Sequence, residues 1–406
     1  MNAEVRPVPR RVRPYEGTQL RRTPFMKLMM GRDPSPTRDE YNEMVAALWQ
    51  GDAPMDTLLD WMYEIGPREG RKLYEQALER GIDSVADAPK PLRDFFRMIE
   101  STPSWVDHAL IEDGVSFIHR TGLAGPYVLR DFALMGGYLL SGFNHALVMT
   151  GALNKGAAQR IAETGKWWVD CTEHDGLSRF GVGFKTTLRV RMVHGMVRRH
   201  LPTRPEWDNS EWGIPVNQTD MLATYLAFGP IMLVGMRAMG IPVTPHESRA
   251  VMHLWKYAAW LMGVEEKWLV DGERDGLVRL YQTFLTQSRA DWTSAELGRA
   301  LSEEPLQRQF FPGGSATLRG FNTNGQYGPT YWRGRGEIAT GFAAARLGLF
   351  SDFGWVGRRD AFTFDPSMVS VGAGVSFLDG LVRIDAARAV RGRSRWKLHL
   401  YLDGLF

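Results

Sequence analysis

The chain has 406 residues, of which 44% are hydrophobic and 23% charged, so it is long enough for two or three domains with buried cores and does not have the composition of a disordered protein. Its 49 basic and 46 acidic residues give a net charge of +3, and no dense Lys/Arg block lies among aromatic residues, so nucleic acid is not predicted as a partner. Because Cys171 is the single cysteine, an intrachain disulfide and a multi-cysteine zinc or iron–sulfur site are excluded.

The first 30 residues are predicted to form a flexible, basic arm. They contain prolines and the arginine pairs Arg10-Arg11 and Arg21-Arg22, but no continuous apolar stretch or small-residue cleavage site follows them. We therefore expect no secretory signal, and a cytoplasmic location for the enzyme-like part of the chain.

From about residue 35 the pattern is helical. Thr37 with Glu40 predicts a capping box at a helix start, and strand signals are nearly absent before residue 300. The uncharged run over residues 132–154 reaches the length of a membrane span. Its three glycines, with Asn144 and His145 at mid-length, favour instead a helix buried inside a large all-α core.

A helix predicted over residues 160–170 carries Arg160, Glu163, Thr164 and Trp167 on one face, because their spacings are three, four and seven. Polar side chains and an aromatic ring on one stripe can line a pocket. A surface Arg–Glu pair with a capped turn at Gly165 has the same spacing, and spacing alone leaves both interpretations open. The glycine-rich connection at residues 174–187 has no preceding strand and no GK[ST], so it does not predict a phosphate-binding loop.

The most informative segment is LRVRMVHGMVRRHL at residues 188–201. Val190, Val193, Val197 and Leu201 fall along one side of a helix, and His194 lies on that side. Arg191 comes one turn before the histidine and Arg198 one turn after it. A neutral imidazole flanked by guanidinium groups suits a haem, whose iron takes one nitrogen ligand and whose propionates bind cations. A core histidine with two surface arginines is the alternative that this helix leaves open.

Two further helix starts follow. Asn217 with Asp220 predicts a helix that runs to about residue 228, and Thr244-Pro245-His246-Glu247 predicts one that ends near Gly263. His246 and His253 lie seven residues apart, but without a third ligand they are expected to be core or surface histidines.

Together these segments resemble the latex-clearing protein (rubber oxygenase) family and its relative, the mycophenolic-acid-pathway oxygenase. The resemblance covers about residues 30–300. It is carried by Arg160 with Thr164, by RMVHGMVR around His194, and by GIPVNQTD with Thr224 and Phe228. It implies an all-α, globin-like fold that holds one haem b. His194 matches the proximal ligand of the haem iron, and Arg160 and Thr164 match residues on the distal side.

The chain departs from the rubber-cleaving members at one position. Those members have a lysine immediately before the threonine, where this chain has Glu163, and their distal acid has no clear counterpart here. Rubber itself is therefore not predicted as the substrate. With His194 on one face of a haem, the other face is open to dioxygen, and Arg160 or Thr164 could donate hydrogen bonds to it. Glu163, if desolvated there, is a candidate base.

From residue 315 the chain becomes glycine-rich and alternating. Strands are expected within residues 331–349, 369–377, 381–386 and 396–402, with turns at Asp379-Gly380 and residues 391–394. LRGF at 318–321 and FSDFG at 350–354 resemble a loop motif and its partner strand motif in outer-membrane barrels of the surface-antigen and two-partner-secretion superfamily. This resemblance implies that Arg319 pairs with Asp352. Four or five strands are too few to close a barrel, so we expect a fragment with open edges.

The sequence therefore predicts a mainly α protein with four parts. These are the arm (1–30), a haem-binding oxygenase domain (31–300), a linker (301–314) and a short antiparallel β region, an incomplete barrel (315–406). The predicted function is haem b-dependent cleavage of C=C bonds by dioxygen in a hydrophobic small-molecule or polymer substrate of hydrocarbon or terpenoid type. Membrane association, and an outer-membrane location, are considered for the β region alone. The alternative function is an outer-membrane-barrel-associated transport or assembly protein whose helical domain is not catalytic.

Overall fold

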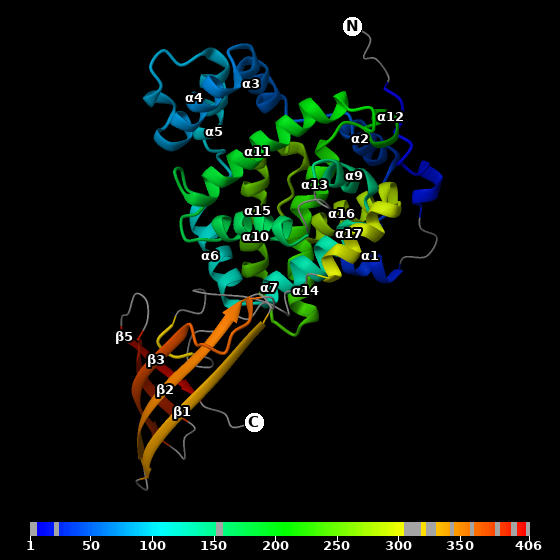
Figure 1. Ribbon diagram of the computed structural model, residues 1–406. Helices are drawn as coiled ribbons and strands as arrows, with labels where there is room; N and C mark the ends of the chain where they lie inside the picture. The colour runs from blue at the N-terminus through cyan, green and yellow to red at the C-terminus, as the bar shows by residue number, and fades with distance from the viewer. Residues whose placement is uncertain are drawn as a thin grey trace. The chain divides into compact units, whose positions relative to one another are not determined.

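The computed structural model describes residues 6–19, 24–151, 157–303, 318–321, 330–341, 345–357, 361–377, 382–390 and 396–402. The chain divides into two compact units, Met1–Glu303 and Glu304–Phe406. The first unit is helical, and the second contains one antiparallel sheet (Figure 1). The predicted class, mainly α with a C-terminal antiparallel β region, is confirmed.

The first unit contains α-helices joined by short 3-10 and π-helical segments. In chain order these are η1 Tyr15–Thr18, α1 Pro24–Met30, α2 Arg38–Ala47, α3 Ala53–Glu64, α4 Pro67–Arg80, η2 Ile82–Ser84, α5 Lys90–Glu100, α6 His108–Arg120, α7 Ala124–Tyr127, η3 Val128–Leu134, α8 Met135–Gly137, α9 Ser141–Met149, α10 Ala157–Cys171, α11 Val182–His200, η4 Leu201–Thr203, α12 Asn209–Trp212, α13 Gln218–Leu226, η5 Ala227–Ile231, α14 Met232–Ala238, α15 Pro245–Met262, η6 Glu266–Trp268, α16 Glu273–Gln287 and α17 Trp292–Glu303.

Helix α15 is the central helix of this unit. It packs against α6, α11 and α13, and ten of its residues are buried, among them Trp255 and Tyr257. The crossing with α6 is close because Gly114 has no side chain: a Cβ built there would lie 2.7 Å from the carbonyl oxygen of Ala250. Such a contact would force the two helices apart, so glycine sets their distance.

The predicted helix starts are confirmed. Thr37 with Glu40 and Thr244 with Glu247 each form a complete capping box, in which the threonine side chain and the glutamate side chain accept each other's backbone N–H. Helix α15 ends at Gly263, whose φ of +98° favours glycine. Each of these signals lies within one turn of sequence, which is why they could be read without tertiary information.

The single buried helix predicted over residues 132–154 is wrong. The π-helix η3 ends within this run, α8 and α9 follow as separate helices, and residues 152–156 lie outside the described part. Phe132 and Leu139 are 55% and 44% exposed. The adjacent Gly136 and Gly137 lower helix propensity where α8 stops, so a lack of charge was not enough to make one continuous helix.

The continuous helical stretch Gln218–Ala238 is long and apolar enough to cross a membrane by those two criteria. Of its apolar window, 67% is buried inside the protein. Pro230 lies within it, and because proline has no N–H to donate, the helix widens there into η5.

The described part of the N-terminal segment is held against the helical unit. Arg11 is 2% exposed and donates to Asp220 at 2.7 Å, and the backbone N–H of Arg13 donates to Thr286. Gly142 makes room for this arginine, since a Cβ there would collide with the Arg11 guanidinium. These contacts correct the expectation of a flexible arm for residues 7–18.

The second unit contains five strands in sequence order. These are β1 Thr330–Gly341, β2 Ala345–Gly357, β3 Met368–Phe377, β4 Val382–Ala389 and β5 Trp396–Leu402, each antiparallel to the next. The turns predicted at residues 379–380 and 391–394 lie outside the described residues.

The predicted pair of Arg319 and Asp352 is confirmed. The Arg319 guanidinium donates to Asp352 at 2.8 Å from both Nε and Nη2, and from Nη1 to Asp385 at 2.6 Å. All three side chains are fully buried, and Arg319 also lies over the ring of Phe350. Burial alone raises the pKa of Asp352, but its hydrogen bonds with Arg319 outweigh this effect and lower it. The carboxylate therefore stays ionised beside its cation.

We expect Arg319→Ala to destabilise the sheet selectively, because it removes the buried cation that Asp352 and Asp385 share and leaves them with the more peripheral Arg335, at 3.0 Å, and Arg383, at 3.5 Å. Loss of one partner of a buried ion pair costs about 3–5 kcal/mol. Hydrogen–deuterium exchange should become faster in the five strands and stay unchanged in α11 and α15. The matched control is Arg38→Ala, whose ion pair with Glu16 is exposed on both sides and should have no measurable effect. Equal protection of the strands in both variants would contradict the role given to Arg319.

Candidate active site

Helices α10 and α11 form an antiparallel pair joined by the glycine-rich connection (Figure 1). At the connected ends the pair is tightly packed: Trp167 donates to Thr187 at 2.9 Å, and the Cys171 thiol lies 3.4 Å from the same hydroxyl. Gly183 is required there, because a Cβ would lie 2.5 Å from the carbonyl oxygen of Asp170. Burial raises the pKa of the Cys171 thiol to about 12, so this cysteine stays protonated and is a packing residue.

His194 lies on the side of α11 that faces α10. It follows Thr187 by seven residues, which is two helical turns, so the two side chains share a face, and Thr187 contacts α10 directly. Val190 and Val197 on this side are half-buried, as is His194, and Leu201 is buried. Val193 is 47% exposed and lies outside this face, which is a difference from the predicted apolar stripe.

The facing stripe of α10 carries two of the predicted catalytic residues. Thr164 precedes Cys171 by seven residues and Arg160 precedes Trp167 by seven, so both positions lie on the stripe that meets α11. Thr164 is nevertheless exposed, as is the neighbouring Glu163. The side chain of Arg160 lies outside the described residues. The two helices are therefore packed at their connected ends, whereas Thr164 and His194, farther along, keep part of their surface accessible.

The two predicted propionate-binding arginines lie on another face of α11, directed toward α3. Arg191 donates to both oxygens of Asp52, at 2.6 and 2.8 Å, and to the carbonyl oxygen of Leu261 at 3.1 Å. Arg198 donates to Asp56 at 2.9 Å. Both arginine side chains are 4% exposed, so neither is the surface arginine of the alternative interpretation.

These contacts favour a structural role for Arg191 and Arg198. Each guanidinium is already bound to a carboxylate, which provides the negative charge that a propionate would otherwise supply. Binding to propionates stays a prediction that the structure does not test. The acidic partners, Asp52 and Asp56, were missed in the sequence, since nothing local marks an acid 139 residues away from Arg191 as its partner.

The polar motif at residues 217–220 holds the surrounding elements together. Gln218 donates to the carbonyl oxygens of Gly51 and Gly263 and accepts from the N–H of Glu265. Asn217 caps α13 by accepting the N–H of Asp220 at 2.9 Å. Asp220 in turn binds Arg11. The motif therefore acts as a buried scaffold beside α11 and does not supply side chains to the face of His194.

Trp167, Phe228 and Trp255 form an aromatic group next to this face. Their ring centroids lie 5.0 to 5.6 Å apart, and they come from α10, η5 and α15. Trp255 is 1% exposed, and among the described residues its indole N–H has no hydrogen-bond partner. A buried donor of this kind is uncommon and is one place where a bound group could supply an acceptor.

Asn144 and His145 do not belong to this face. Asn144 donates to the carbonyl oxygen of Tyr138, and His145 is bound to Asp291 at 2.8 Å and stacked on Trp212. His246 and His253 contact Asp113 and the backbone of Asp107. The expectation that these last two are ordinary core or surface histidines is consistent with those contacts.

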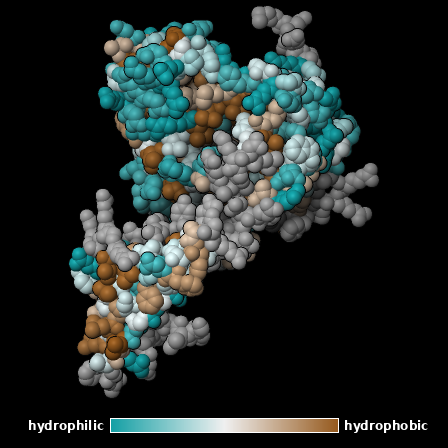
Figure 2. All heavy atoms as spheres, in the orientation of Figure 1, coloured by the Kyte–Doolittle hydropathy of each residue, from teal (hydrophilic) through white to brown (hydrophobic). Residues whose placement is uncertain are grey.

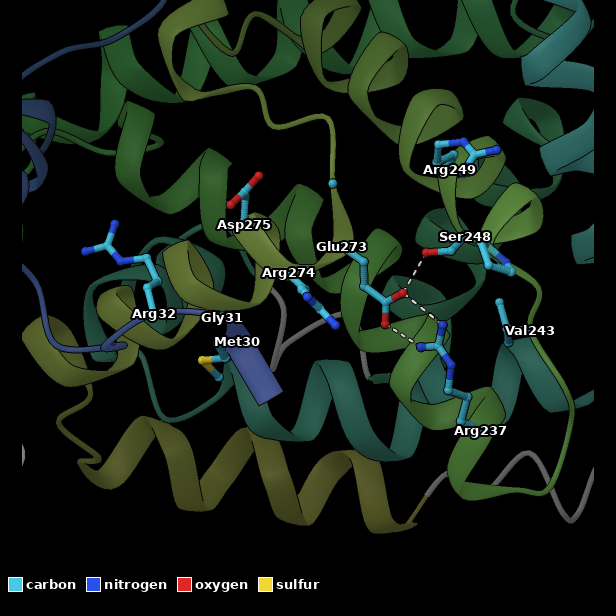
Figure 3. Close-up of a pocket in the computed structure, with 12 residues that line it drawn as sticks. Met30, Gly31, Arg32, Arg237, Val243, Ser248, Arg249, Glu273, Arg274 and Asp275 are labelled. Carbon is cyan, nitrogen blue, oxygen red and sulfur yellow. Dashed lines mark hydrogen bonds and ion pairs between the residues drawn. The ribbon is translucent and has the colours of Figure 1, made fainter. Parts of the chain in front are cut away.

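A separate open pocket of about 780 Å³ lies where the first turns of α15 and α16 meet residues 30–32 (Figure 3). Figure 3 shows Glu273 near its centre, bound by Ser248 and Arg237. Three more arginines line it, Arg32, Arg249 and Arg274, and none of the predicted site residues does. Its charged lining does not suit an apolar macrocycle.

Residues 119–347 match the family described as the catalytic domain of ER-bound oxygenase mpaB/B' and rubber oxygenase. Over 200 residues the chain is 28% identical to the rubber oxygenase of Streptomyces sp. (strain K30). The aligned part is 48% of this chain and 47% of that enzyme, so the chain spans about half the length of this curated relative.

The fold is similar to that of the latex clearing protein LCP in its closed state. The TM-score is 0.52 at 22% identity, over 63% of this chain and 69% of that chain. A likeness at this identity bears on the fold alone.

We expect Arg191→Ala to lower the free energy of unfolding of the haem-free helical unit by about 3–5 kcal/mol, because the buried Asp52 carboxylate loses its bidentate partner and keeps the more distant cation of Arg198, at 3.9 Å. Urea unfolding followed by far-ultraviolet circular dichroism measures this change. Arg199→Ala is the matched control on the same helix: its partner Asp60 is exposed, and the cost should stay within about 1 kcal/mol. If the two variants unfold alike, the buried pair with Asp52 is not what stabilises α11.

Proposed function

Because this chain belongs to the family of ER-bound oxygenase mpaB/B' and rubber oxygenase catalytic domains, we propose that it is a haem b-dependent oxygenase that cleaves carbon–carbon double bonds of a hydrophobic substrate with dioxygen. The observation that carries the proposal is the position of His194. It lies on the face of α11 that faces α10, on the side of α10 that carries the positions of Arg160 and Thr164.

The residues present fit a haem. A haem iron needs one nitrogen from the protein and an otherwise apolar lining, because the macrocycle supplies the other four nitrogens. His194 offers that nitrogen between the half-buried Val190 and Val197. In the described part of the chain no group of three or more His, Cys, Asp and Glu is arranged to hold a bare metal ion. A single histidine on an apolar face is suited to a haem and not to a bare ion.

The bound haem would supply the redox chemistry that activates dioxygen. His194 would hold the iron through one ring nitrogen. From α10, Arg160 and Thr164 would donate hydrogen bonds that orient dioxygen. The Glu163 carboxylate would accept a proton from the substrate and return it before the products leave, so that the cycle releases no net proton. Glu163 and Thr164 are adjacent on the exposed part of α10, so both can be reached from solvent. Glu163 is thus not desolvated, which differs from the condition under which the sequence predicts a base at this position.

The proposed reaction transfers both oxygen atoms of one dioxygen molecule to the two carbons of a double bond, which gives two carbonyl groups and needs no further reductant. The aromatic group Trp167, Phe228 and Trp255 supports a hydrophobic substrate of hydrocarbon or terpenoid type, small or polymeric. Glu163, which replaces the lysine of the rubber-cleaving members, is the reason not to name rubber itself.

The alternative function, a transport or assembly protein of the outer membrane with a non-catalytic helical domain, gains no support from the comparisons. The family match includes α10, α11 and α13, where the candidate residues lie. A cytoplasmic location and membrane association of the β region remain predictions.

We expect His194→Ala to lose most of its haem, because it removes the axial donor of the proposed site. The full chain is purified, reconstituted with haem, and its Soret absorbance is compared with protein concentration. His200→Ala, an exposed histidine six residues later on the same helix, is the control and should bind haem like the wild type. A wild-type chain that folds but shows no Soret band contradicts the proposal as a whole. If His194→Ala keeps its full haem content, the iron ligand is instead His145 or His200.

We expect Glu163→Gln to keep its haem and to lose turnover by roughly 100-fold, as for removal of a general base. Carbonyl products from an unsaturated isoprenoid oligomer, measured by mass spectrometry under labelled dioxygen, report the activity. Glu173→Gln, another exposed acid in this region, is the control. An unchanged rate in Glu163→Gln would remove the base role and leave the haem assignment intact.

A further inference from the structure

One face of the sheet is predominantly apolar, and we call it the apolar face. Strand pairing places Ile338 beside Leu349, and side chains two residues apart along a strand share a face. Its described members are Trp332, Gly334, Gly336, Ile338, Thr340, Leu347, Leu349, Ser351, Phe353, Trp355, Val369, Val371, Ala373, Val375, Ile384, Ala386, Arg388, Trp396 and Leu398. Arg388 is the single charged residue among them.

Most of the apolar face is exposed, but at one end Trp355 is buried against Phe362, and Trp332 packs on Phe364. Ile338, Leu349 and Leu398 are 81%, 69% and 75% exposed, which is unusual for three large aliphatic side chains on one face of a sheet. Figure 2 shows strongly hydrophobic side chains gathered on the visible surface of the sheet. Single exposed apolar residues are normal, but a continuous patch of this extent marks an interaction surface.

The opposite face is covered over its central strands, whereas Arg333, Arg335 and Glu337 of β1 are exposed. Residues 318–321 lie across it, and Leu318 packs against Val356 and Met368 while Arg319 binds Asp352 and Asp385. This face is therefore not available to a partner, because binding there would require residues 318–321 to leave and would expose the buried ion pairs of Arg319. A partner that covers the sheet must bind the apolar face.

We propose that the apolar face binds the same face of a second copy of this chain, so that two sheets form a sandwich across a two-fold axis. The face has nearly no charge, so two identical copies do not repel each other. An apolar surface that pairs with itself is what a two-fold interface requires. Stacked sheets pack about 10 Å apart, and the side chains of the two apolar faces would fill this layer.

The size of the face fits a stable dimer. Five strands at about 4.8 Å spacing and about eight residues at about 3.3 Å rise give roughly 600–700 Å² per copy. The total is then roughly 1,300 Å², within the range of specific protein–protein interfaces. The interface would contain three large aliphatic anchors per copy, Ile338, Leu349 and Leu398, near which water is excluded.

The sheet edges favour a protein partner over lipid. In the described residues β1 and β5 have no further strand beside them, so their outer N–H and C=O groups need water. Within a bilayer each of these groups would remain unsatisfied at a high cost in free energy. A face-to-face dimer leaves both edges in water. Charged side chains on the edge strands, such as Arg335 and Lys397, also protect them from edge-to-edge pairing.

Sedimentation velocity of the full chain at micromolar concentration tests the proposal. We expect a dimer for the wild type and a monomer for Leu349→Glu, with the dissociation constant raised roughly 100-fold or more, since the two-fold places two charges in one apolar layer. The control Leu123→Glu introduces the same charge at a 63% exposed leucine of the helical unit and should remain dimeric. If Leu349→Glu unfolds the sheet, Leu349→Thr keeps strand propensity and should still weaken the dimer.

Cross-linking locates the contact. Val371 lies on the central strand β3, near the expected two-fold axis, and Cys171 is buried, so Val371→Cys provides the reactive thiol. A short bis-maleimide should link two copies of this variant, and Leu123→Cys should give no such product. A monomeric wild type, or a Leu349→Glu variant that stays dimeric, overturns the proposal. So does a monomer that co-floats with phosphatidylcholine vesicles through this face, because lipid would then be its partner.

Discussion

The orientation of α11 depends on one buried ionic contact. Arg191 binds Asp52 in a bidentate manner, and the nearby Arg198 binds Asp56, so two turns of the same helix are fixed to the N-terminal end of α3. Arg191 also donates to the carbonyl oxygen of Leu261 at the end of α15. A buried guanidinium without its carboxylate would cost several kcal/mol, so α11 cannot rotate about its axis without breaking these pairs. Because His194 lies between the two arginines in sequence and on the neighbouring face, the same contact directs its imidazole toward α10.

The surrounding elements shield the Arg191–Asp52 ion pair from water. Asp52 is both the partner of Arg191 and the N-cap of α3, and Gly263 must be glycine because a Cβ there would collide with the Asp52 carboxylate. Gln218 ties the loop after α15 to Gly51, directly before Asp52. Farther out, Arg11 from the N-terminal segment neutralises Asp220 of the same motif. Four segments distant in sequence thus meet at one set of buried charges. Each segment supplies the hydrogen-bond or ion-pair partner of a buried polar group from another segment.

How far the sequence predicts this structure depends on the range of each interaction. Thr37 with Glu40 and Thr244 with Glu247 act within one turn, and they were predicted correctly. The partners of Arg191 and Arg198 were not, because a guanidinium beside a histidine has the same local pattern whether it binds a propionate or an aspartate 139 residues away. The break of the apolar run at residues 132–154 was missed for the opposite reason. There, hydrophobicity suggested one buried helix, while the glycines and a π-helical segment divide it.

The sheet shows the same limit in another form. A period of two separates the residues of a strand into two sets but does not say which set is buried. Counting hydrophobic residues would put Ile338, Leu349 and Leu398 inside, yet they are exposed, and Asp352 and Asp385 are buried. Arg319 determines which face is buried, because its side chain requires two carboxylates as partners and enough space between the strands to fit. Gly372 and Gly374 provide that volume, since a Cβ at Gly374 would collide with Asp385 and one at Gly372 with Phe350, which lies against the guanidinium. Glycines that face aspartates on neighbouring strands therefore indicate a buried cation. The hydrophobic residues of the strands then lie mainly on the other face, where most of them are exposed in the described part of this unit.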